Sequence, residues 1–118
     1  MTYNDLVQIL LYNNMYNELK QKEQELFRLI PELQDCKGFN QNTKWHIYDV
    51  YEYILHVVSG VEFNIYLRLV ALFHDIGKPL TYTEDNSGVG HFYEHWNKSS
   101  EIFKKYQNKF ELSNEEKN

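Results

Sequence analysis

Residues 69–79 read Leu-Val-Ala-Leu-Phe-His-Asp-Ile-Gly-Lys-Pro, and this stretch governs how the rest of the chain is interpreted. An almost wholly apolar run ends in a histidine beside an aspartate, and Gly-Lys-Pro follows at once. Such a pair is unusual in a segment built for packing alone. His74 offers an imidazole nitrogen and Asp75 a carboxylate oxygen, and borderline or hard divalent metals bind both. The stretch therefore predicts a metal-binding pair at the end of a buried helix.

The size and composition of the chain indicate one folded domain over residues 1–118. Of its 118 residues, 42% are hydrophobic and 16% are aromatic, which is enough for one modest core. The net charge of −5 provides no overall basic field for nucleic acid. No signal peptide and no membrane-spanning segment are indicated. The single cysteine, Cys36, excludes an intrachain disulfide, so a reducing, cytoplasmic compartment is expected.

Hydrophobic periodicity predicts an all-α chain, a bundle of about five helices. The segment before His74 is apolar almost all round except for Arg68, so we expect it to be the central helix. Residues 81–83 alternate briefly, but they lie in a Gly-rich connection, and no strand is predicted there. The expected helices begin near Asn4, run from Met15 to about Pro31, from Trp45 to Val58, from Glu62 to His74 and from Phe92 to Phe110, with connections at residues 34–43 and 75–90.

All five histidines fall between His46 and His95. His91 and His95 have helical i, i+4 spacing and are expected to share one helix face. His46 and His56 belong to the preceding predicted helix, and side chains on facing helices are how a bundle builds a metal centre. Taken singly, however, His46 and His56 are more often hydrogen-bonded structural residues, and Lys78 is more often a surface lysine.

The chemistry that such a site predicts is hydrolysis of a phosphoester. A divalent metal lowers the pKa of bound water and neutralises charge on a phosphoryl oxygen. His74, Asp75 and Lys78 are the predicted catalytic residues, with the lysine binding a phosphate oxygen. The sequence has no Walker A loop, no Gly-x-Ser-x-Gly elbow and no cysteine nucleophile in a recognisable setting.

Further segments join residues 69–79 in an ordered set: Pro31-Glu32-Leu33, Gly38-Phe39-x-Gln41-Asn42, Trp45-His46-x-Tyr48-Asp49-Val50-Tyr51-Glu52, and His91-Phe92-Tyr93-x-His95 followed by Ser99 or Ser100. Residues 69–79 resemble the core signature of the HD superfamily of metal-dependent phosphohydrolases. The other segments look like those of the HD domains in bacterial CCA-adding tRNA nucleotidyltransferases. The resemblance covers roughly residues 29–113, and here the domain stands without the nucleotidyltransferase part.

The resemblance implies an all-α HD fold with a divalent metal (Mn, Ni, Mg, Fe or Zn) at His74 and Asp75. It implies that His95, together with His91, supplies further ligands or contacts phosphate. In the family, reactions at this site include hydrolysis of phosphomonoesters and of cyclic phosphodiesters.

Two positions depart from the family pattern. Tyr53 stands where the family has its first metal-binding histidine, and a neutral phenol is a poor ligand compared with imidazole. His56, at i+3 from Tyr53, and His46 are the candidate substitutes. The family's final metal-binding aspartate has no counterpart, because no aspartate follows Asp85.

Two functions follow from these residues. The first is a metal-dependent phosphohydrolase that acts on a nucleotide, a cyclic nucleotide or another phosphorylated small molecule, or on an RNA-end phosphate. The second is a degenerate HD domain that binds a nucleotide, a protein partner or a second copy of itself without turnover. An unrelated helical interaction protein is a third alternative. The residue at position 53 favours impaired or altered catalysis. A homodimer and a protein partner are both expected as assemblies, and a membrane is not.

Overall fold

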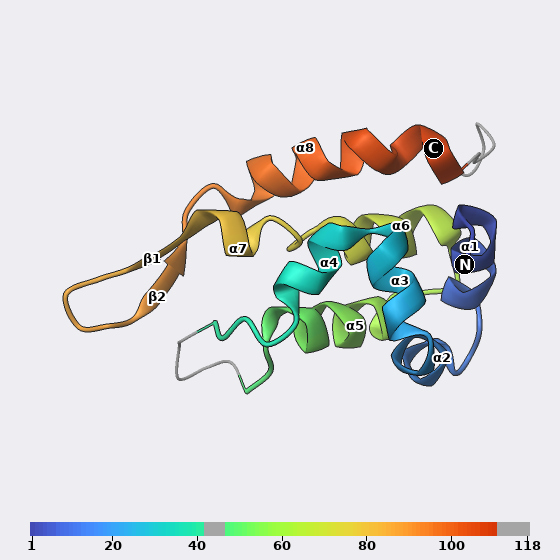
Figure 1. Ribbon diagram of the computed structural model, residues 1–118, viewed down its shortest axis with the longest axis horizontal. Coiled ribbons are helices and arrows are strands. Elements are labelled where there is room, and N and C mark those ends of the chain that lie inside the picture. The colour runs from blue at the N-terminus through green and yellow to red at the C-terminus, as the bar shows by residue number, and fades with distance from the viewer. Residues whose placement is uncertain (42–46, 111–118) are drawn as a thin grey trace.

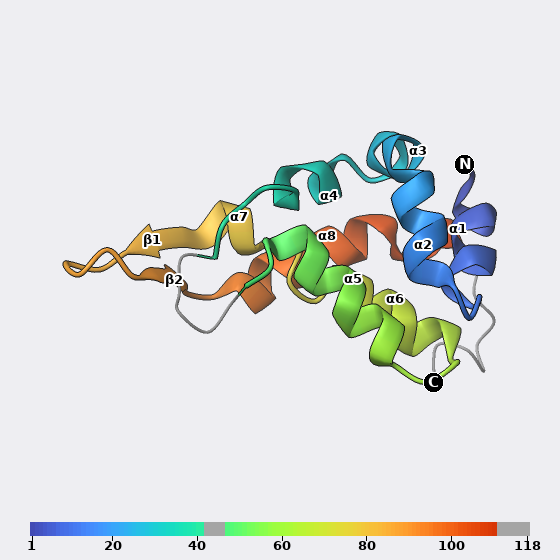
Figure 2. The ribbon, with the colours of Figure 1, turned by 90° about the horizontal axis from the view of Figure 1, so that it is seen from below.

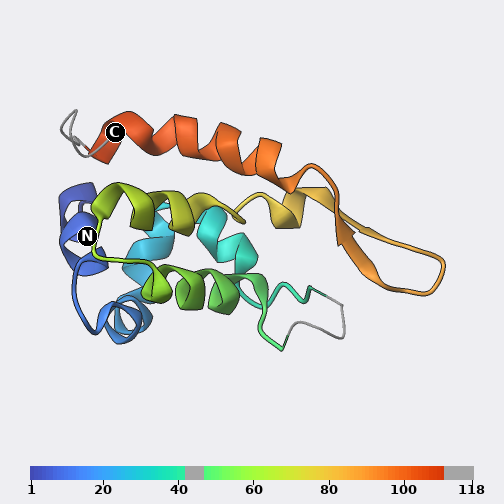
Figure 3. The same cartoon turned by 180° about the vertical axis from the view of Figure 1, so that it is seen from behind.

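The computed structural model describes residues 1–41 and 47–110, and helices account for most of them (Figure 1). The central element is α6 (Ile65–Phe73), which lies between α5 (Val50–Gly60) and α8 (His95–Gln107) (Figure 3). The predicted all-α fold is therefore confirmed. None of the described helices is both long and apolar enough to cross a membrane.

The first helix, α1 (Tyr3–Leu10), begins close to its predicted start because Thr2 and Asp5 cap it. The Thr2 hydroxyl accepts a hydrogen bond from the Asp5 N–H at 3.0 Å, and Asp5 Oδ2 accepts one from the Thr2 N–H at 2.8 Å. This reciprocal capping box satisfies two N–H groups that a helix start leaves without partners.

The prediction of one continuous helix from Met15 to about Pro31 is wrong. Two helices, α2 (Met15–Gln21) and α3 (Glu23–Leu29), meet at Lys22, whose backbone angles (φ −105°, ψ 23°) leave the helical region. A further helix, α4 (Pro31–Cys36), starts at its proline instead of ending there. Proline suits a first helical position because its missing N–H has no partner there in any case.

Asp49 starts α5 and also holds the preceding loop. Its Oδ1 accepts a hydrogen bond from the Glu52 N–H at 2.7 Å, and its Oδ2 accepts one from the Gly38 N–H at 2.7 Å. Asp49 therefore acts as the N-cap of α5 while it anchors the end of α4 against that helix. The predicted start at Trp45 lies outside the described residues.

Arg68, the charged exception in the apolar central helix, is buried with 3% of its surface exposed. Its guanidinium donates to the carbonyl oxygens of Leu10 at 2.6 Å and of Val61 at 2.7 Å and 3.0 Å. These carbonyls end α1 and α5, where a cation complements the negative end of the helix dipole. Arg68 thus joins both helix ends to α6.

A small hairpin follows α6, where no strand was predicted. The short helix α7 (Lys78–Thr81) leads into β1 (Tyr82–Glu84), which pairs antiparallel with β2 (Gly90–Phe92). Figures 1 and 2 both show this hairpin projecting away from the helices. Its projection makes the molecule longer in one direction, with extents of 47 × 27 × 26 Å.

The turn of the hairpin explains why two such short strands pair. Asp85 Oδ1 accepts hydrogen bonds from the N–H groups of Ser87 at 2.8 Å and Val89 at 3.1 Å. Gly88 has a φ of +78°, in the left-handed region that glycine adopts without steric cost. Side-chain turn contacts of this kind are typical of aspartate. They allow the two strands to pair although the sequence of the segment has only a weak preference for strands.

The last helix, α8, begins at His95 and not at the predicted Phe92, because Phe92 belongs to β2 and Glu94 has a φ of 61°. It continues into a short 3-10 turn (Asn108–Phe110). Its inner face packs on the end of α6, where the rings of Phe73 and Phe103 stack with centroids 5.2 Å apart. The buried apolar side chains of α1 to α6 and of α8 form one core cluster.

Gly77 allows the turn after α6 to approach the backbone of α8. A Cβ at this position would lie 2.7 Å from Lys98 Cβ, 2.7 Å from Ser99 N and 2.9 Å from His95 O. Two of these atoms belong to the backbone, so they cannot rotate away. The Gly77 N–H also donates to Ser99 Oγ at 2.9 Å. The contact between α6 and α8 therefore requires a residue without a side chain.

We expect Gly77→Ala to lower the free energy of unfolding by about 1–3 kcal/mol, because the added methyl overpacks a backbone contact. Gly60→Ala is the matched control, since a Cβ at Gly60 would meet nothing within 4 Å and alanine is the better helix former. Urea unfolding followed by circular dichroism measures both variants. Equal stability of the two would contradict the close approach of α8.

Glu52 connects α5 to α2 through two partners. The Tyr16 hydroxyl donates to Glu52 Oε2 at 2.6 Å, and the Lys20 ammonium forms an ion pair with Oε1. Burial favours the neutral carboxyl, but the hydrogen bonds from Lys20 and Tyr16 outweigh it, so the pKa of Glu52 lies below its ordinary value of 4.5. The folded state therefore binds this proton more weakly than the unfolded state does.

The contribution of Glu52 to stability should depend on pH in a defined direction. A carboxyl whose pKa is lowered by folding stabilises the protein above its ordinary pKa, and this stabilisation disappears as the pH falls through the folded value. Glu52→Gln should therefore cost about 1 kcal/mol near neutral pH, with the difference from wild type vanishing in acid. Urea unfolding across the acid range measures it. Glu101→Gln, at a residue whose side chain is 67% exposed, should show no such trend.

Candidate functional site

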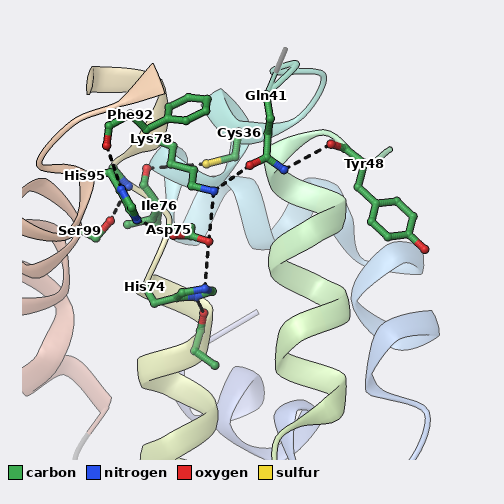
Figure 4. Close-up of polar contacts among 12 residues, drawn as sticks. Cys36, Gln41, Tyr48, His74, Asp75, Ile76, Lys78, Phe92, His95 and Ser99 are labelled. Atoms are coloured by element: carbon green, nitrogen blue, oxygen red, sulfur yellow. Dashed lines mark hydrogen bonds and ion pairs between the residues drawn. The ribbon is translucent and has the colours of Figure 1, made fainter. Parts of the chain in front are cut away.

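Four of the predicted site residues, His74, Asp75, Lys78 and His95, gather where α6 ends (Figure 4). The Asp75 carboxylate lies at the centre, with His74 Nε2 at 2.9 Å from Oδ2 and His95 Nε2 at 3.0 Å from Oδ1. Lys78 Nζ lies 3.5 Å from Oδ2. The carboxylate is buried, with 4% of the Asp75 surface exposed. Three nitrogen-bearing side chains thus surround one carboxylate.

The side chains around Asp75 come from two parts of the chain, the turn that follows α6 and the start of α8. His74, Asp75 and Lys78 belong to the turn that leaves α6, which the Lys78 N–H closes by donating to the Asp75 carbonyl at 3.0 Å. His95 comes from the first turn of α8. The close approach at Gly77 brings that turn near enough for His95 to reach the carboxylate.

Both imidazoles are held by backbone carbonyls on their far side. His74 Nδ1 contacts the Ala71 carbonyl, and His95 Nδ1 contacts the Phe92 carbonyl at 2.9 Å. Each ring therefore has an oxygen at both nitrogens, and a neutral imidazole donates from only one of them. Carbonyl contacts at Nδ1 are the usual way in which proteins orient a metal-binding histidine.

The charges of this cluster stabilise one another. Burial disfavours the charged form of His74, but the hydrogen bond and charge of Asp75 outweigh it, so the pKa of His74 lies above its ordinary value. Burial likewise opposes ionisation of Asp75, but the hydrogen bond from His74 and the charges of His74, Lys78 and His95 lower its pKa. Asp75 is therefore an ionised carboxylate at neutral pH.

Lys78 is buried inside the site, with 7% of its surface exposed. Its ammonium donates to Gln41 Oε1 at 2.7 Å. The rings of Tyr53 and Phe92 flank it, with centroids 5.0 Å and 5.3 Å from Nζ, which adds cation–π attraction. The interpretation of Lys78 as a surface lysine is therefore wrong, because the hairpin and α5 cover it.

Gln41 is a site residue that the sequence did not reveal. It is fully buried, and it links Lys78 to the Tyr48 carbonyl, to which its Nε2 donates at 3.4 Å. A Cβ on Gly90 would lie 2.7 Å from the Gln41 carbonyl, so the hairpin packs directly on this loop. Gln41 belongs to the Gly38-Phe39-x-Gln41-Asn42 segment of the family resemblance, but that resemblance assigned it no role, and a polar residue in a predicted loop is normally solvated.

Tyr53 faces the cluster from α5. Its ring centroid lies 6.4 Å from that of His74, and its ring receives the Lys78 ammonium. The residue that the resemblance assigned to the first ligand position thus lies against this site.

The remaining histidines lie apart from Asp75. His56 stacks on Tyr48 with centroids 4.4 Å apart and lies 3.9 Å from Glu52. His91 belongs to β2, where its Nε2 contacts Asp85 Oδ2 at 2.9 Å, so it does not share a helix face with His95 as expected. The structure brings neither His56 nor His91 to the carboxylate. His46 lies outside the described residues.

The donor atoms of the cluster suit a divalent metal in type. Two imidazole nitrogens and a carboxylate are ligands for Zn²⁺ and related ions. The side chains now contact one another directly. As they stand, no group of three or more His, Cys, Asp or Glu among the described residues could hold a metal ion.

A comparison with protein-family models identifies the family of the chain. The model described as HD domain matches residues 43–117, which is more than half of the chain and includes Asp75 together with His74, Lys78 and His95. No curated protein and no solved structure matches the chain. The likeness to the HD domains of CCA-adding enzymes thus stays a prediction.

Removing the carboxylate should destabilise the protein more than removing the lysine. We expect Asp75→Asn to cost about 3–5 kcal/mol, because it leaves a buried ammonium without its counter-ion. Lys78→Met should cost less, because Asp75 keeps His74 and His95 as partners. The double variant should recover part of the loss of Asp75→Asn. Urea unfolding of all four proteins at neutral pH with a chelator gives the coupling energy, and additive losses would contradict the pairing.

Proposed function

The chain belongs to the HD domain family, a superfamily of metal-dependent phosphohydrolases, and we propose that it hydrolyses a phosphoester with a divalent metal held by His74, Asp75 and His95. One observation carries the proposal. Two imidazoles, each oriented by a backbone carbonyl at Nδ1, direct Nε2 to the two oxygens of one buried carboxylate. The carbonyl at Nδ1 is the feature that suits a metal ligand, because an Nδ1–H that donates to it leaves the lone pair on Nε2.

Each residue has a distinct part in the proposed reaction. Asp75 supplies the negative charge that a cation requires, and the two histidines supply neutral nitrogen ligands. Lys78 offers its ammonium to a phosphate oxygen from within the same cluster. A divalent metal, when bound there, activates water and neutralises charge on the phosphoryl group.

The proposed substrates are a nucleotide, a cyclic nucleotide or another phosphorylated small molecule, and an RNA-end phosphate. All of these substrates contain a phosphoester, and the cluster can bind the phosphoryl group of each. Association with a second copy or with a protein partner is a separate proposal and is not required for this chemistry.

A binding domain without turnover is the second candidate, and a specific observation favours it. Lys78 already places an ammonium 3.5 Å from Asp75, and Tyr53 lies against His74 in place of an imidazole ligand. An ammonium beside the carboxylate and one ligand fewer both weaken metal binding. In this candidate, the same cluster binds a phosphate but holds a metal too weakly for hydrolysis.

The proposal predicts stoichiometric binding of Mn²⁺, Ni²⁺ or Zn²⁺ and hydrolysis of p-nitrophenyl phosphate or a 2′,3′-cyclic nucleotide. His95→Ala should lower metal affinity roughly tenfold or more and abolish turnover, because it removes a ligand. His91→Ala is the matched control, since His91 pairs with Asp85 in the hairpin. Calorimetry and a colorimetric phosphate assay measure the two effects.

The same experiment separates the two candidates. Phosphate binding without turnover under excess metal would support the binding domain and overturn the hydrolase. Tyr53→His should then raise metal affinity, because it restores an imidazole beside His74. Loss of turnover in both His91→Ala and His95→Ala would contradict the placement of the site.

A further inference from the structure

A groove between α6 and α8 adjoins the Asp75 cluster and has a different chemical character. Its volume is about 260 Å³, and its lining includes Val70, Phe73, His74, Trp96, Ser100 and Phe103. Most of these side chains are apolar, and among the described residues that line the groove His74 alone can carry a charge. The groove therefore suits an uncharged group that buries apolar surface.

Trp96 is the most exposed aromatic side chain of the groove, with 61% of its surface open to solvent. Its ring meets the His95 imidazole edge to face, with centroids 5.7 Å apart, so the indole is held in place while most of it stays open. Single exposed apolar side chains are common on protein surfaces. Trp96 differs from them because it forms one wall of a groove whose other walls are also apolar.

The remaining walls are aromatic and aliphatic. Phe73 is buried and stacks on Phe103 with ring centroids 5.2 Å apart, and Val70 precedes Phe73 by one helical turn on α6. Aromatic rings attract one another in offset-stacked and edge-to-face arrangements. A planar ring in the groove can therefore contact the Trp96 indole on one side and these side chains on the other.

The size and the polar groups of the groove narrow the kind of ring. Its volume lies just below the range of pockets that take a whole drug-sized ligand, and a protein partner needs a much larger surface. The groove thus has room for one ring system. The hydroxyl groups of Ser99 and Ser100 also line it, and a hydroxyl can pair with the ring nitrogens and exocyclic groups of a nucleobase. The net charge of −5 disfavours a nucleic-acid polymer as the source of that base.

We propose that the groove between α6 and α8 binds the nucleobase of a nucleoside or nucleotide, with the base stacked on Trp96. His74 belongs both to this groove and to the cluster around Asp75, so a nucleotide whose base occupies the groove can extend past His74 toward the cluster. The inference rests on the proposed function only where it makes this ligand a substrate. Binding of the base itself requires neither a metal nor turnover.

The test is titration of adenosine into the full chain in the presence of a chelator, followed by methyl NMR spectra. Adenosine has no phosphate, so its binding reports on the groove and not on the cluster. The ring current of the base should shift the methyl signals of Val70 until they saturate, while those of Val89, exposed in the hairpin turn, stay in place. Ribose alone should shift neither. Absence of a saturable shift at Val70 would overturn the proposal.

Benzyl alcohol in place of adenosine tests whether the groove prefers a nucleobase to any aromatic ring. We expect adenosine to bind about fivefold or more tightly, because a base offers a larger stacking surface and groups that pair with the serine hydroxyls. Equal or tighter binding of benzyl alcohol would overturn the assignment of the groove to a nucleobase.

Replacement of Trp96 tests the stacking residue. Trp96→Ala should weaken adenosine binding about fivefold or more, the lower end of base–aromatic stacking, and Trp96→Phe should keep most of the affinity. Tyr93→Ala is the matched control, since Tyr93 is 66% exposed and stacks on His91 in place of lining the groove. Trp96 is largely exposed, so its variants should fold as the wild type does, which circular dichroism checks. Equal affinities of the two alanine variants would overturn the role of Trp96.

The outcomes also distinguish this inference from the proposed function. Saturable adenosine binding in the chelator would support the groove whether or not the chain hydrolyses a phosphoester. Hydrolysis of p-nitrophenyl phosphate by a chain that binds no adenosine would leave the proposed function in place and overturn the nucleobase site. The wild-type titrations decide this without any variant.

Discussion

The rest of the structure depends on the pairing of the buried Asp75 carboxylate with the nitrogens of His74, Lys78 and His95. These three side chains come from the end of α6, from α7 and from the start of α8. A buried carboxylate persists only where it is paired and hydrogen-bonded. The arrangement of the three elements around it therefore satisfies an electrostatic requirement as well as a packing one. The same requirement gives Asp75 a lowered pKa and keeps it ionised.

Several structural features serve this constraint from a distance. Gly77 permits the backbone contact that delivers His95, and the paired strands bring Phe92 over Lys78 and its carbonyl to His95 Nδ1. The hairpin is thus part of the site. On the opposite side, Gln41 connects Lys78 to the loop that precedes α5. Membership of the HD family accounts for the His74-Asp75 pair, and Tyr53 lies beside it with its ring against His74 and Lys78.

Some features of the molecule are local properties of the sequence, and others depend on contacts between distant segments. The buried central helix was predicted because its segment is apolar almost all round except for Arg68, which is a local property of the sequence. Sequence-based prediction joined α2 and α3 into one helix, because the hydrophobic period continues past Lys22 although the backbone there does not. It also discounted residues 81–83 as a strand, because a strand becomes stable only with its partner, and β2 pairs with it through a turn organised by Asp85.

The sequence by itself determined the helical class and the adjacent imidazole and carboxylate at a helix end, because periodicity and covalent neighbours are local facts. Tertiary structure alone decided that His95 reaches Asp75 while His91 pairs with Asp85 in the hairpin. It also decided that Lys78 is buried against Gln41 and Tyr53. The physical reason is that ligand geometry and desolvation depend on distances between elements, and hydrophobic pattern and spacing along the chain do not contain those distances.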